Sequence, residues 1–167
     1  MSTFVSIGNG HQPFTRLLDA VDAIADNLPQ PVVVQHGHTP FASTRCTATA
    51  FMPMDEFMAQ IVHARLVIIH GGVGSILSAL QGGGIPIVVP RLAAMGEIID
   101  DHQLDLARAL ASVGRVALVE DTVNLGAAVM DAAAHNCAAP ATRTDMPLVA
   151  MVKRILSDVH ARNRASA

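Results

Sequence analysis

Residues 66–81 read LVIIHGGVGSILSALQ, and this stretch decides the fold class. The four apolar residues 66–69 form a run of the length typical of a buried strand. A glycine-rich turn follows, and apolar residues then recur at the three- and four-residue spacing of one helix face. A strand, a tight turn and a helix in succession make one β-α unit, which predicts a parallel sheet.

The same alternation recurs on both sides of this stretch. Strands are expected at residues 3–7, 31–35, 45–51, 66–69, 86–89 and 116–119. Helices are expected at residues 13–27, 54–63, 74–81, 98–111 and 123–133. The sequence therefore predicts an α/β fold with a doubly wound, Rossmann-like parallel sheet, in which ligands bind beyond the carboxyl ends of the strands.

The length and the pattern predict one domain. The chain has 167 residues, 51% of them apolar, which is enough for a single core. Residues 1–134 are expected to form that domain, and residues 135–145, rich in Ala, Pro and Thr, to form a connector. Residues 146–167 predict an amphipathic helix and a tail, and the apolar stripe of this helix either folds back on the sheet or docks on a partner.

Charge and composition disfavour several classes of protein. The formal net charge of -3 argues against a nucleic-acid partner, which would need a basic surface. No run approaches the roughly 20 apolar residues that span a bilayer, so no direct membrane span is expected. The two cysteines lie outside any CxxC spacing and no signal-type segment is recognised, which favours the cytoplasm. Trp and Tyr are absent, so ligand contacts are expected from polar side chains and backbone amides.

Two glycine-rich turns follow expected strands. Residues 8–10, Gly-Asn-Gly, predict either a phosphate cradle or an ordinary tight turn. Residues 70–75 open a helix, where unpaired amides and the helix dipole favour an anion. This second turn lacks the acidic residue that a dinucleotide site places about 20 positions later, and it lacks the Gly-Lys-Ser/Thr of a P-loop.

Polar residues also follow the fifth expected strand. Arg91 and Glu97 precede the segment 100–103, which reads DDHQ at an expected helix start. Capping of the helix explains one acidic residue but not the neighbouring His102 and Gln103. We therefore interpret this segment as part of a ligand site.

Histidines near the strand ends raise the question of a metal. His36 and His38 follow the second expected strand, and with His70 and His102 they could be imagined as zinc ligands. No HExxH or His-Cys pattern accompanies them, so no metal site is predicted.

Taken together, these segments resemble the nucleotide-sugar-binding C-terminal domain of glycosyltransferase family 28, a domain of the two-domain GT-B organisation. The resemblance covers residues 3–132. It is greatest for single-domain members, which are subunits of transferases that act on dolichol-linked sugars or that make bacterial exopolysaccharides. It is carried by residues 5–8 (VSIG), 34–37 (VQHG), 69–77 (IHGGVGSIL), 86–91 (PIVVPR), 96–97 (GE) and 100–104 (DDHQL).

The resemblance implies a hexosyltransferase that uses a UDP-sugar and needs no metal or other cofactor. The glycine loops would hold the diphosphate, the turn at residues 51–54 would meet uracil through its backbone, and Asp101, His102 and Gln103 would lie near the sugar. The implied donor-binding residues are Gly8, Asn9, Gly10, Gln35, Met52, His70, Gly71, Gly72, Gly74, Ser75, Ser78, Arg91, Glu97, Asp101, His102 and Gln103.

One position departs from the family pattern. A large family member holds the donor ribose with a Glu three residues after the position of Ser75, and this sequence has Ser78 there. Serine supplies a hydroxyl but no charge. Either Glu97 takes over this contact, or the ribose is held differently.

The resemblance also implies that this chain lacks the part of the enzyme that binds the acceptor. In GT-B enzymes the acceptor and usually the base belong to the other domain. We therefore expect a donor-binding catalytic subunit that extends a lipid-linked saccharide in bacterial polysaccharide synthesis, beside a separate membrane-anchored acceptor-binding subunit that holds it at the membrane surface. His11 and His102 are the candidate bases of this chain. A non-catalytic nucleotide-binding or regulatory module on the same fold and a UDP-sugar epimerase remain the alternatives.

Overall fold

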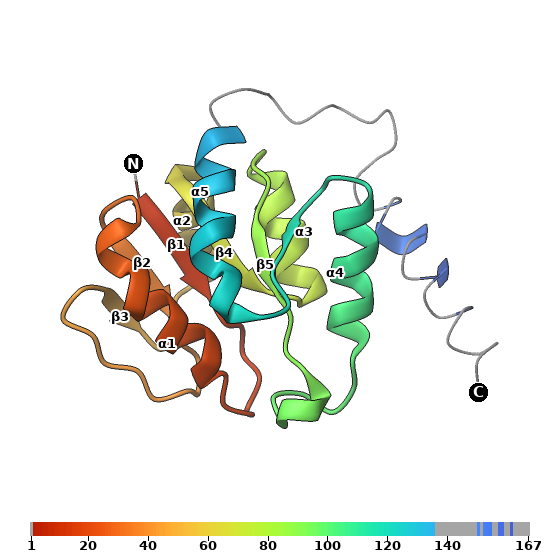
Figure 1. Ribbon diagram of the computed structural model, residues 1–167, viewed down its shortest axis with the longest axis horizontal. Helices are drawn as coiled ribbons and strands as arrows, with labels where there is room; N and C mark the ends of the chain where they lie inside the picture. The colour runs from red at the N-terminus through yellow and green to blue at the C-terminus, as the bar shows by residue number, and fades with distance from the viewer. Residues whose placement is uncertain (1, 136–149, 151, 155–156, 159–160, 162–167) are drawn as a thin grey trace.

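The computed structural model describes residues 2–135, 150, 152–154, 157–158 and 161, and it contains one six-stranded parallel sheet (Figure 1). The strand order is β3-β2-β1-β4-β5-β6, which reverses direction between β1 and β4. This is the predicted doubly wound arrangement.

The strands are β1 (Ser2–Ser6), β2 (Val32–Gln35), β3 (Thr47–Thr49), β4 (Ala64–His70), β5 (Ile87–Val89) and β6 (Ala117–Leu118). The helices are α1 (Thr15–Ile24), α2 (Met54–His63), α3 (Val73–Gln81), α4 (His102–Ser112) and α5 (Leu125–His135), with short 3-10 helices η1 (Ala25–Asn27), η2 (Ala93–Met95) and η3 (Thr122–Asn124).

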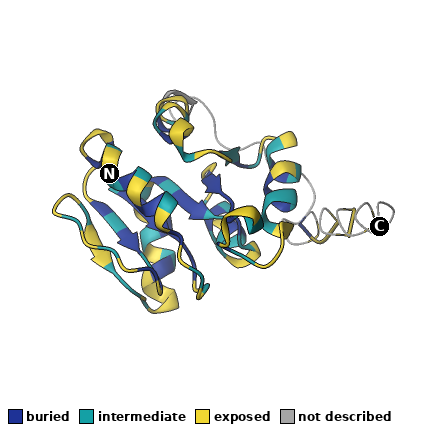
Figure 2. Cartoon of the chain, turned by 60° about the horizontal axis from the view of Figure 1, so that its bottom comes forward, coloured by how far each residue is buried: buried dark blue, intermediate teal, exposed yellow. Residues whose placement is uncertain are grey.

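Helices cover both faces of the sheet, so the central strands β1, β2, β4 and β5 are largely buried on both sides, whereas the edge strand β3 is largely exposed (Figures 1 and 2). Helices α1 and α5 pack on one face, while α2, α3 and α4 pack on the other. Consecutive strand residues face opposite layers: Val5 packs with α1, whereas Phe4 packs with Phe57 of α2. This double burial explains why the strands are almost continuously apolar.

The fourth expected helix begins later than its apolar pattern suggests. It was expected over residues 98–111, but α4 starts at His102. The Asp100 carboxylate accepts a hydrogen bond from the His102 backbone N–H at 3.1 Å, and Gly96 turns the preceding chain with a φ of +68°. The N-cap residue, Asp101, makes no side-chain capping hydrogen bond, so the turn at Gly96 and the Asp100–His102 contact accompany the late start of the helix.

The third strand is also shorter than expected. Residues 45–51 were expected to be extended, but β3 covers only Thr47–Thr49. The preceding residues turn toward α1, where the Asp22 carboxylate binds the Ser43 hydroxyl at 2.5 Å and the Arg45 guanidinium at 2.6 Å. These side-chain bonds compete with the strand ladder at the sheet edge.

The C-terminal part of the chain is described only at a few positions. The expected connector lies outside the described residues except for His135, which ends α5. Residues 152–154 are helical, and the Val152 side chain is buried among Ile69, Ile76 and Leu106. At this position the expected terminal helix folds back on its own domain. Within the described part of the chain, no helix is both long and apolar enough to cross a membrane.

Two loops cross so closely that glycine is required. Gly37 follows β2 with a φ of +54°, and a Cβ there would clash with the carbonyl oxygen of Gly8. Gly114 has a similar φ of +68°, but no atom lies within 4 Å of the Cβ that a substitution would add. Substitution of Gly114 would therefore cause backbone strain alone, whereas substitution of Gly37 would cause backbone strain and a steric clash.

We predict that Gly37→Ala destabilises the fold more than Gly114→Ala. The Gly114 variant should lose about 1 kcal/mol, the usual cost of the left-handed conformation for an L-residue. The Gly37 variant should lose at least about 1 kcal/mol more, because its Cβ also displaces the Gly8 loop. Urea unfolding followed by far-ultraviolet circular dichroism measures both values, and equal losses would contradict the prediction.

Candidate functional site

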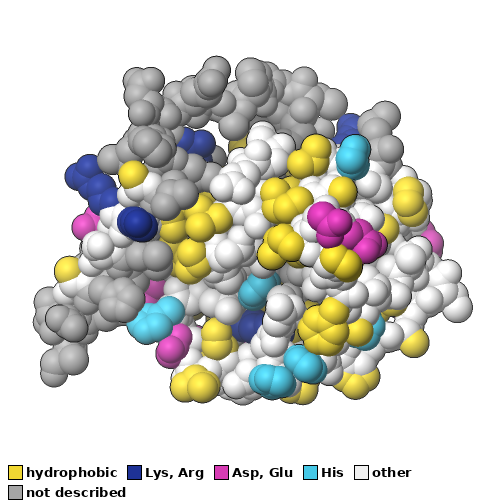
Figure 3. Space-filling model, turned by 180° about the vertical axis from the view of Figure 1, so that it is seen from behind, with side chains coloured by type: hydrophobic (Ala, Val, Ile, Leu, Met, Phe, Trp, Pro, Cys, Tyr) yellow, Lys and Arg dark blue, Asp and Glu magenta, His cyan; other side chains and the backbone are white. Residues whose placement is uncertain are grey.

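A cavity of about 360 Å³ opens at the carboxyl ends of β1, β2 and β4. The strand order reverses between β1 and β4, and doubly wound sheets bind ligands at this place. The molecule seen from behind is hollowed, and histidine side chains lie in and beside the hollow (Figure 3). The cavity is lined by Ser6, Gly8, Asn9, Gln35, Met52, Met54, Phe57, His70, Gly72, Gly74, Ser75 and Ser78.

The first turn of α3 forms one side of this cavity. Helical hydrogen bonding begins where the Ile76 N–H donates to the Gly72 carbonyl at 3.0 Å, so residues 73–75 carry amides of the unpaired first turn. Gly74 and Ser75 line the cavity beside these amides. The free amides, the helix dipole and the Ser75 hydroxyl suit an anionic ligand.

The ring of His70 lies between two glycines. A Cβ added to Gly8 or to Gly72 would clash with this imidazole, so both positions need glycine for packing. Burial, and secondarily the positive charge of Arg91, lower the pKa of His70 to about 4, while the Ser6 carbonyl opposes this shift. His70 is therefore neutral at neutral pH.

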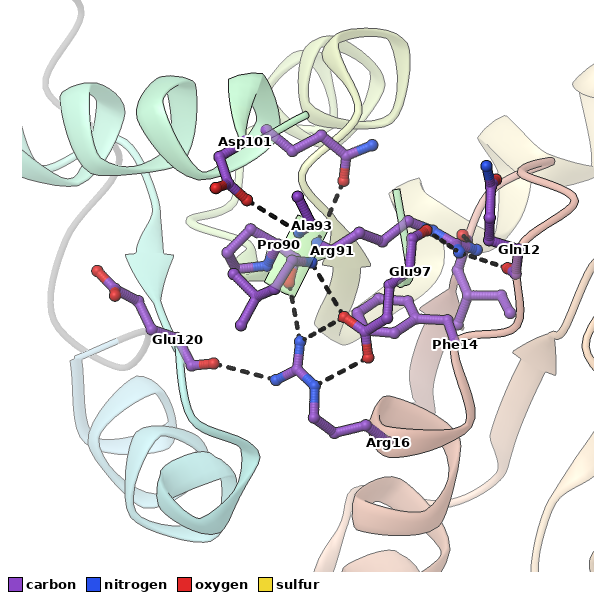
Figure 4. Close-up of polar contacts among 12 residues, drawn as sticks. Gln12, Phe14, Arg16, Pro90, Arg91, Ala93, Glu97, Asp101 and Glu120 are labelled. Atoms are coloured by element: carbon purple, nitrogen blue, oxygen red, sulfur yellow. Dashed lines mark hydrogen bonds and ion pairs between the residues drawn. The ribbon is translucent and has the colours of Figure 1, made fainter. Parts of the chain in front are cut away.

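Arg91 is buried behind the loop that follows β1 (Figure 4). Its Nη1 donates to the Gln12 carbonyl at 2.6 Å and to the Glu97 carbonyl at 3.1 Å. Its Nη2 donates to the Ile7 carbonyl at 3.0 Å. Burial lowers the pKa of Arg91, and the Glu97 charge partly opposes this effect. The guanidinium therefore joins the β1–α1 loop to the β5–α4 loop.

The Glu97 carboxylate forms an ion pair with a second arginine, Arg16. Arg16 donates to Glu97 from Nε at 3.0 Å and from Nη2 at 2.9 Å, and the same carboxylate accepts the Leu92 N–H at 3.0 Å. We call Arg16, Arg91 and Glu97 the arginine cluster. Two guanidinium charges against one carboxylate leave the cluster with one positive charge in excess. The described residues lining the cavity carry no charge at neutral pH, so this excess favours an anion in the cavity.

Comparison with known proteins identifies the family. The model of the family described as "Glycosyltransferase family 28 C-terminal domain" matches residues 4–159. The chain belongs to this family. The UDP-N-acetylglucosamine transferase subunit ALG13 of Yarrowia lipolytica (strain CLIB 122 / E 150) is 33% identical over 78 residues, which are 47% of this chain and 38% of that protein.

Solved glycosyltransferase structures share the fold. The glycotransferase of kitacinnamycin superposes with a TM-score of 0.63 at 21% identity, over 98% of this chain and 39% of that one. CalG4, the calicheamicin glycosyltransferase, superposes with a TM-score of 0.56 at 22% identity, over 96% of this chain and 38% of that one. The chain thus spans about two fifths of the length of these relatives. The predicted family and Rossmann-like fold are confirmed.

The structure brings many of the predicted donor-binding residues together at one cavity, where their contact with a donor remains a prediction. Those lining it are Gly8, Asn9, Gln35, Met52, His70, Gly72, Gly74, Ser75 and Ser78. They come from three loops, from the ends of β2 and β4, and from the first turns of α3. This grouping follows from the parallel sheet, which brings the carboxyl ends of its strands to one edge.

The remaining predicted residues do not line the cavity. Gly71 instead packs against α4, since an added Cβ would lie 2.8 Å from the Gln103 Cβ. An added Cβ at Gly10 would lie 3.3 Å from the Arg91 Cζ. The Asp101 carboxylate accepts the Ala93 N–H at 2.9 Å. These contacts give the β5–α4 segment a structural role.

The two candidate bases, His11 and His102, are exposed, and neither lines the cavity. His11 stacks on His38 with ring centroids 4.4 Å apart, and His38 meets Phe51 edge-on at 5.0 Å. His102 is exposed, with its Nε2 3.7 Å from the Asp100 carboxylate. Among the residues described, no group of three or more His, Cys, Asp or Glu side chains could hold a metal ion.

Two lining residues, Ser6 and Phe57, were missed from the sequence, whereas Met54 belongs to the turn at residues 51–54 that was predicted to meet uracil. Ser6 ends β1 inside the sheet, and its hydroxyl donates to the Gln35 Oε1 at 3.2 Å. Met54 and Phe57 belong to the first turn of α2 and line the cavity beside Met52. A polar residue that ends an apolar run could have indicated Ser6. The apolar spacing of residues 54–63 predicted a helix but did not single out Phe57.

We predict that His70 makes the fold less stable in acid. Its pKa is about 4 when folded and 6.5 when unfolded, so between these values the unfolded chain binds a proton that the folded chain does not. The stabilisation is full above pH 6.5 and falls by on the order of 3 kcal/mol as the pH drops to about 4. Unfolding free energies across this range should decline less for His70→Asn than for the wild type. His63→Asn, at an exposed position, is the control, and parallel curves for the His70 variant and the wild type would refute this account.

Proposed function

We propose that this chain is the donor-binding catalytic subunit of a UDP-sugar-dependent glycosyltransferase. It extends a lipid-linked saccharide in bacterial polysaccharide synthesis. It acts with a separate, membrane-associated subunit that binds the acceptor, and it reaches the membrane through that partner from the cytoplasm.

The observation that carries the proposal is an uncharged cavity between the first turn of α3 and a buried excess of positive charge. The diphosphate of a nucleotide-sugar needs hydrogen-bond donors and positive potential, and this cavity offers both without a charged side chain on its lining. The family membership of the chain supports a nucleotide-sugar as the anion.

The same features support departure of the nucleotide. In the proposed reaction an acceptor hydroxyl oxygen bonds to the anomeric carbon, the bond from that carbon to the phosphate oxygen breaks, and UDP leaves with the electron pair. Amides of residues 73–75, the Ser75 hydroxyl and the arginine cluster would stabilise the negative charge that develops on the diphosphate. This arrangement needs no metal ion.

The proton of the acceptor hydroxyl needs a separate base. His70 is poorly suited, because its pKa of about 4 makes it a weak base near neutral pH. His11 and His102 are exposed outside the cavity lining and remain candidates. A base on the acceptor-binding partner is the other possibility.

The name of one relative supports the proposal of a partner subunit. The Yarrowia protein is named as a subunit, and this chain aligns with 38% of its length. The solved glycosyltransferases also extend well beyond the part that this chain covers. In this proposal a second polypeptide supplies the acceptor-binding part.

We predict that the purified chain binds UDP and UDP-sugars in preference to ADP and ATP. Ser75→Ala should weaken UDP binding about 2- to 10-fold through loss of one hydrogen bond. Gly74→Val should weaken it at least about tenfold, because its side chain would project into the cavity beside the helix amides. Isothermal titration calorimetry measures these affinities.

Gly126→Val is the matched control for the glycine variant. Gly126 lies in α5, where an added Cβ also has no atom within 4 Å, and it does not line the cavity. This variant should bind UDP like the wild type. Preference for adenine nucleotides would instead favour the regulatory nucleotide-binding module.

We predict that sugar transfer requires a membrane partner. Membranes of the source organism lacking this chain should regain transfer from a radiolabelled UDP-sugar when the wild-type chain is added, but not when Gly74→Val is added. A panel of UDP-sugars would identify the donor. Full-rate transfer to an extracted lipid acceptor by the purified chain alone would refute the partner requirement.

A further inference from the structure

Arg91 is a buried charge held by three side-chain hydrogen bonds, yet it does not line the cavity. Its guanidinium donates to three backbone carbonyls, those of Ile7, Gln12 and Glu97. Two of these carbonyls flank the segment 8–11, which carries the cavity residues Gly8 and Asn9. A single side chain therefore determines where both ends of this segment lie.

Aromatic packing fixes the same guanidinium from another side. The Arg91 Cζ lies 4.8 Å from the centroid of the Phe14 ring, and the Arg16 Cζ lies 5.3 Å from it. The Phe14 backbone N–H donates to the Thr39 hydroxyl at 3.0 Å, which anchors the start of α1 to the β2–β3 loop. Arg91 is thus confined by packing as well as by hydrogen bonds.

The Arg91 charge also has no carboxylate of its own. Glu97 offers Arg91 a backbone carbonyl, while its carboxylate is held by Arg16. The Arg91 Nε is buried without a hydrogen-bond partner. A buried guanidinium whose hydrogen bonds all go to backbone carbonyls projects positive potential into the neighbouring cavity, although the Glu97 charge partly offsets it.

We propose that Arg91 is a positioning residue that holds the β1–α1 loop in its ligand-binding shape and supplies positive potential to the cavity from behind, without touching the ligand. The consequence for UDP affinity rests on the proposed function. The consequences for the loop and for the electrostatics of the cavity do not, because both are measurable in the free protein.

Two substitutions separate the two roles. Arg91→Met removes the charge and the hydrogen bonds, whereas Arg91→Lys keeps the charge but cannot bond three carbonyls in the geometry of a guanidinium. Arg108→Met is the matched control, because it removes an equal charge from an exposed ion pair with Glu120. All three are compared with the wild-type chain.

The first readout is the pKa of His70, followed by NMR titration of its imidazole without ligand. Arg91→Met should raise this pKa above about 4, since the Arg91 charge helps to lower it. Arg91→Lys and Arg108→Met should leave it near the wild-type value. A purely mechanical role for Arg91 would leave the pKa unchanged in a folded Arg91→Met variant, and that result would overturn the electrostatic part.

The second readout is amide hydrogen exchange at residues 8–12, and the third is UDP affinity by calorimetry. Exchange should accelerate in both Arg91 variants and stay unchanged in Arg108→Met. UDP binding should weaken at least about tenfold in Arg91→Met, from lost loop order and lost potential, and less in Arg91→Lys. Unchanged exchange in Arg91→Lys would overturn the positioning role.

The outcomes also separate this inference from the proposed function. If Arg91→Met loses its dispersed NMR spectrum, the Arg91→Lys variant decides: faster exchange with an unchanged His70 pKa supports the inference, and wild-type exchange overturns it. If the wild-type chain fails to bind UDP, the proposed function is wrong. The pKa and exchange measurements then still decide the role of Arg91.

Discussion

The close approach of two glycine loops around one imidazole is the constraint on which the site depends. β1 and β4 are neighbours in the sheet but more than 60 residues apart in sequence, and the His70 ring lies between the loops that follow them. A side chain at Gly8 or at Gly72 would collide with this ring. The separation of the two loops, and hence the shape of the cavity, therefore follows from the thickness of an aromatic ring. The doubly wound strand order creates this meeting, because it places the reversal point between these two strands.

Burial of charge behind the cavity has a cost that the backbone offsets. An isolated guanidinium is expensive to remove from water, and a single carboxylate partner would cancel the potential that an anionic ligand needs. Here three carbonyl dipoles solvate Arg91, while the one carboxylate nearby is held mainly by Arg16. The charge is thus stabilised without being neutralised. The same field helps to keep His70 neutral, so the lining stays uncharged while the region behind it is positive.

Much of this organisation could be predicted from the sequence, and the predictions that were wrong or incomplete have a common cause. Apolar periodicity located all six strands and five helices, and residues at strand ends located the cavity, because a parallel sheet brings those ends to one edge. The contacts of Arg91 and Glu97 with other loops could not be predicted in this way. Arg16 and Glu97 are 81 positions apart, and Arg91 reaches carbonyls 79 and 84 positions away. Local pattern indicates which residues are polar near a strand end, but only tertiary packing decides whether they face a ligand or another loop. The shortened β3 has a similar origin, since Asp22 of α1 binds the residues before it.

The electrostatics of the cavity also bear on where a base can lie in the proposed reaction. A histidine base becomes positively charged when it accepts a proton, so a positive field that stabilises a diphosphate weakens any imidazole placed close to it. His70 illustrates this effect, with a pKa lowered to about 4 by burial and by Arg91. Deep in this cavity, stabilisation of the leaving group and acceptance of a proton by histidine are therefore incompatible. In the proposed reaction a histidine base would therefore be an exposed one, such as His11 or His102, or would belong to another polypeptide. Separation of donor and acceptor functions between two chains is consistent with this physical conflict.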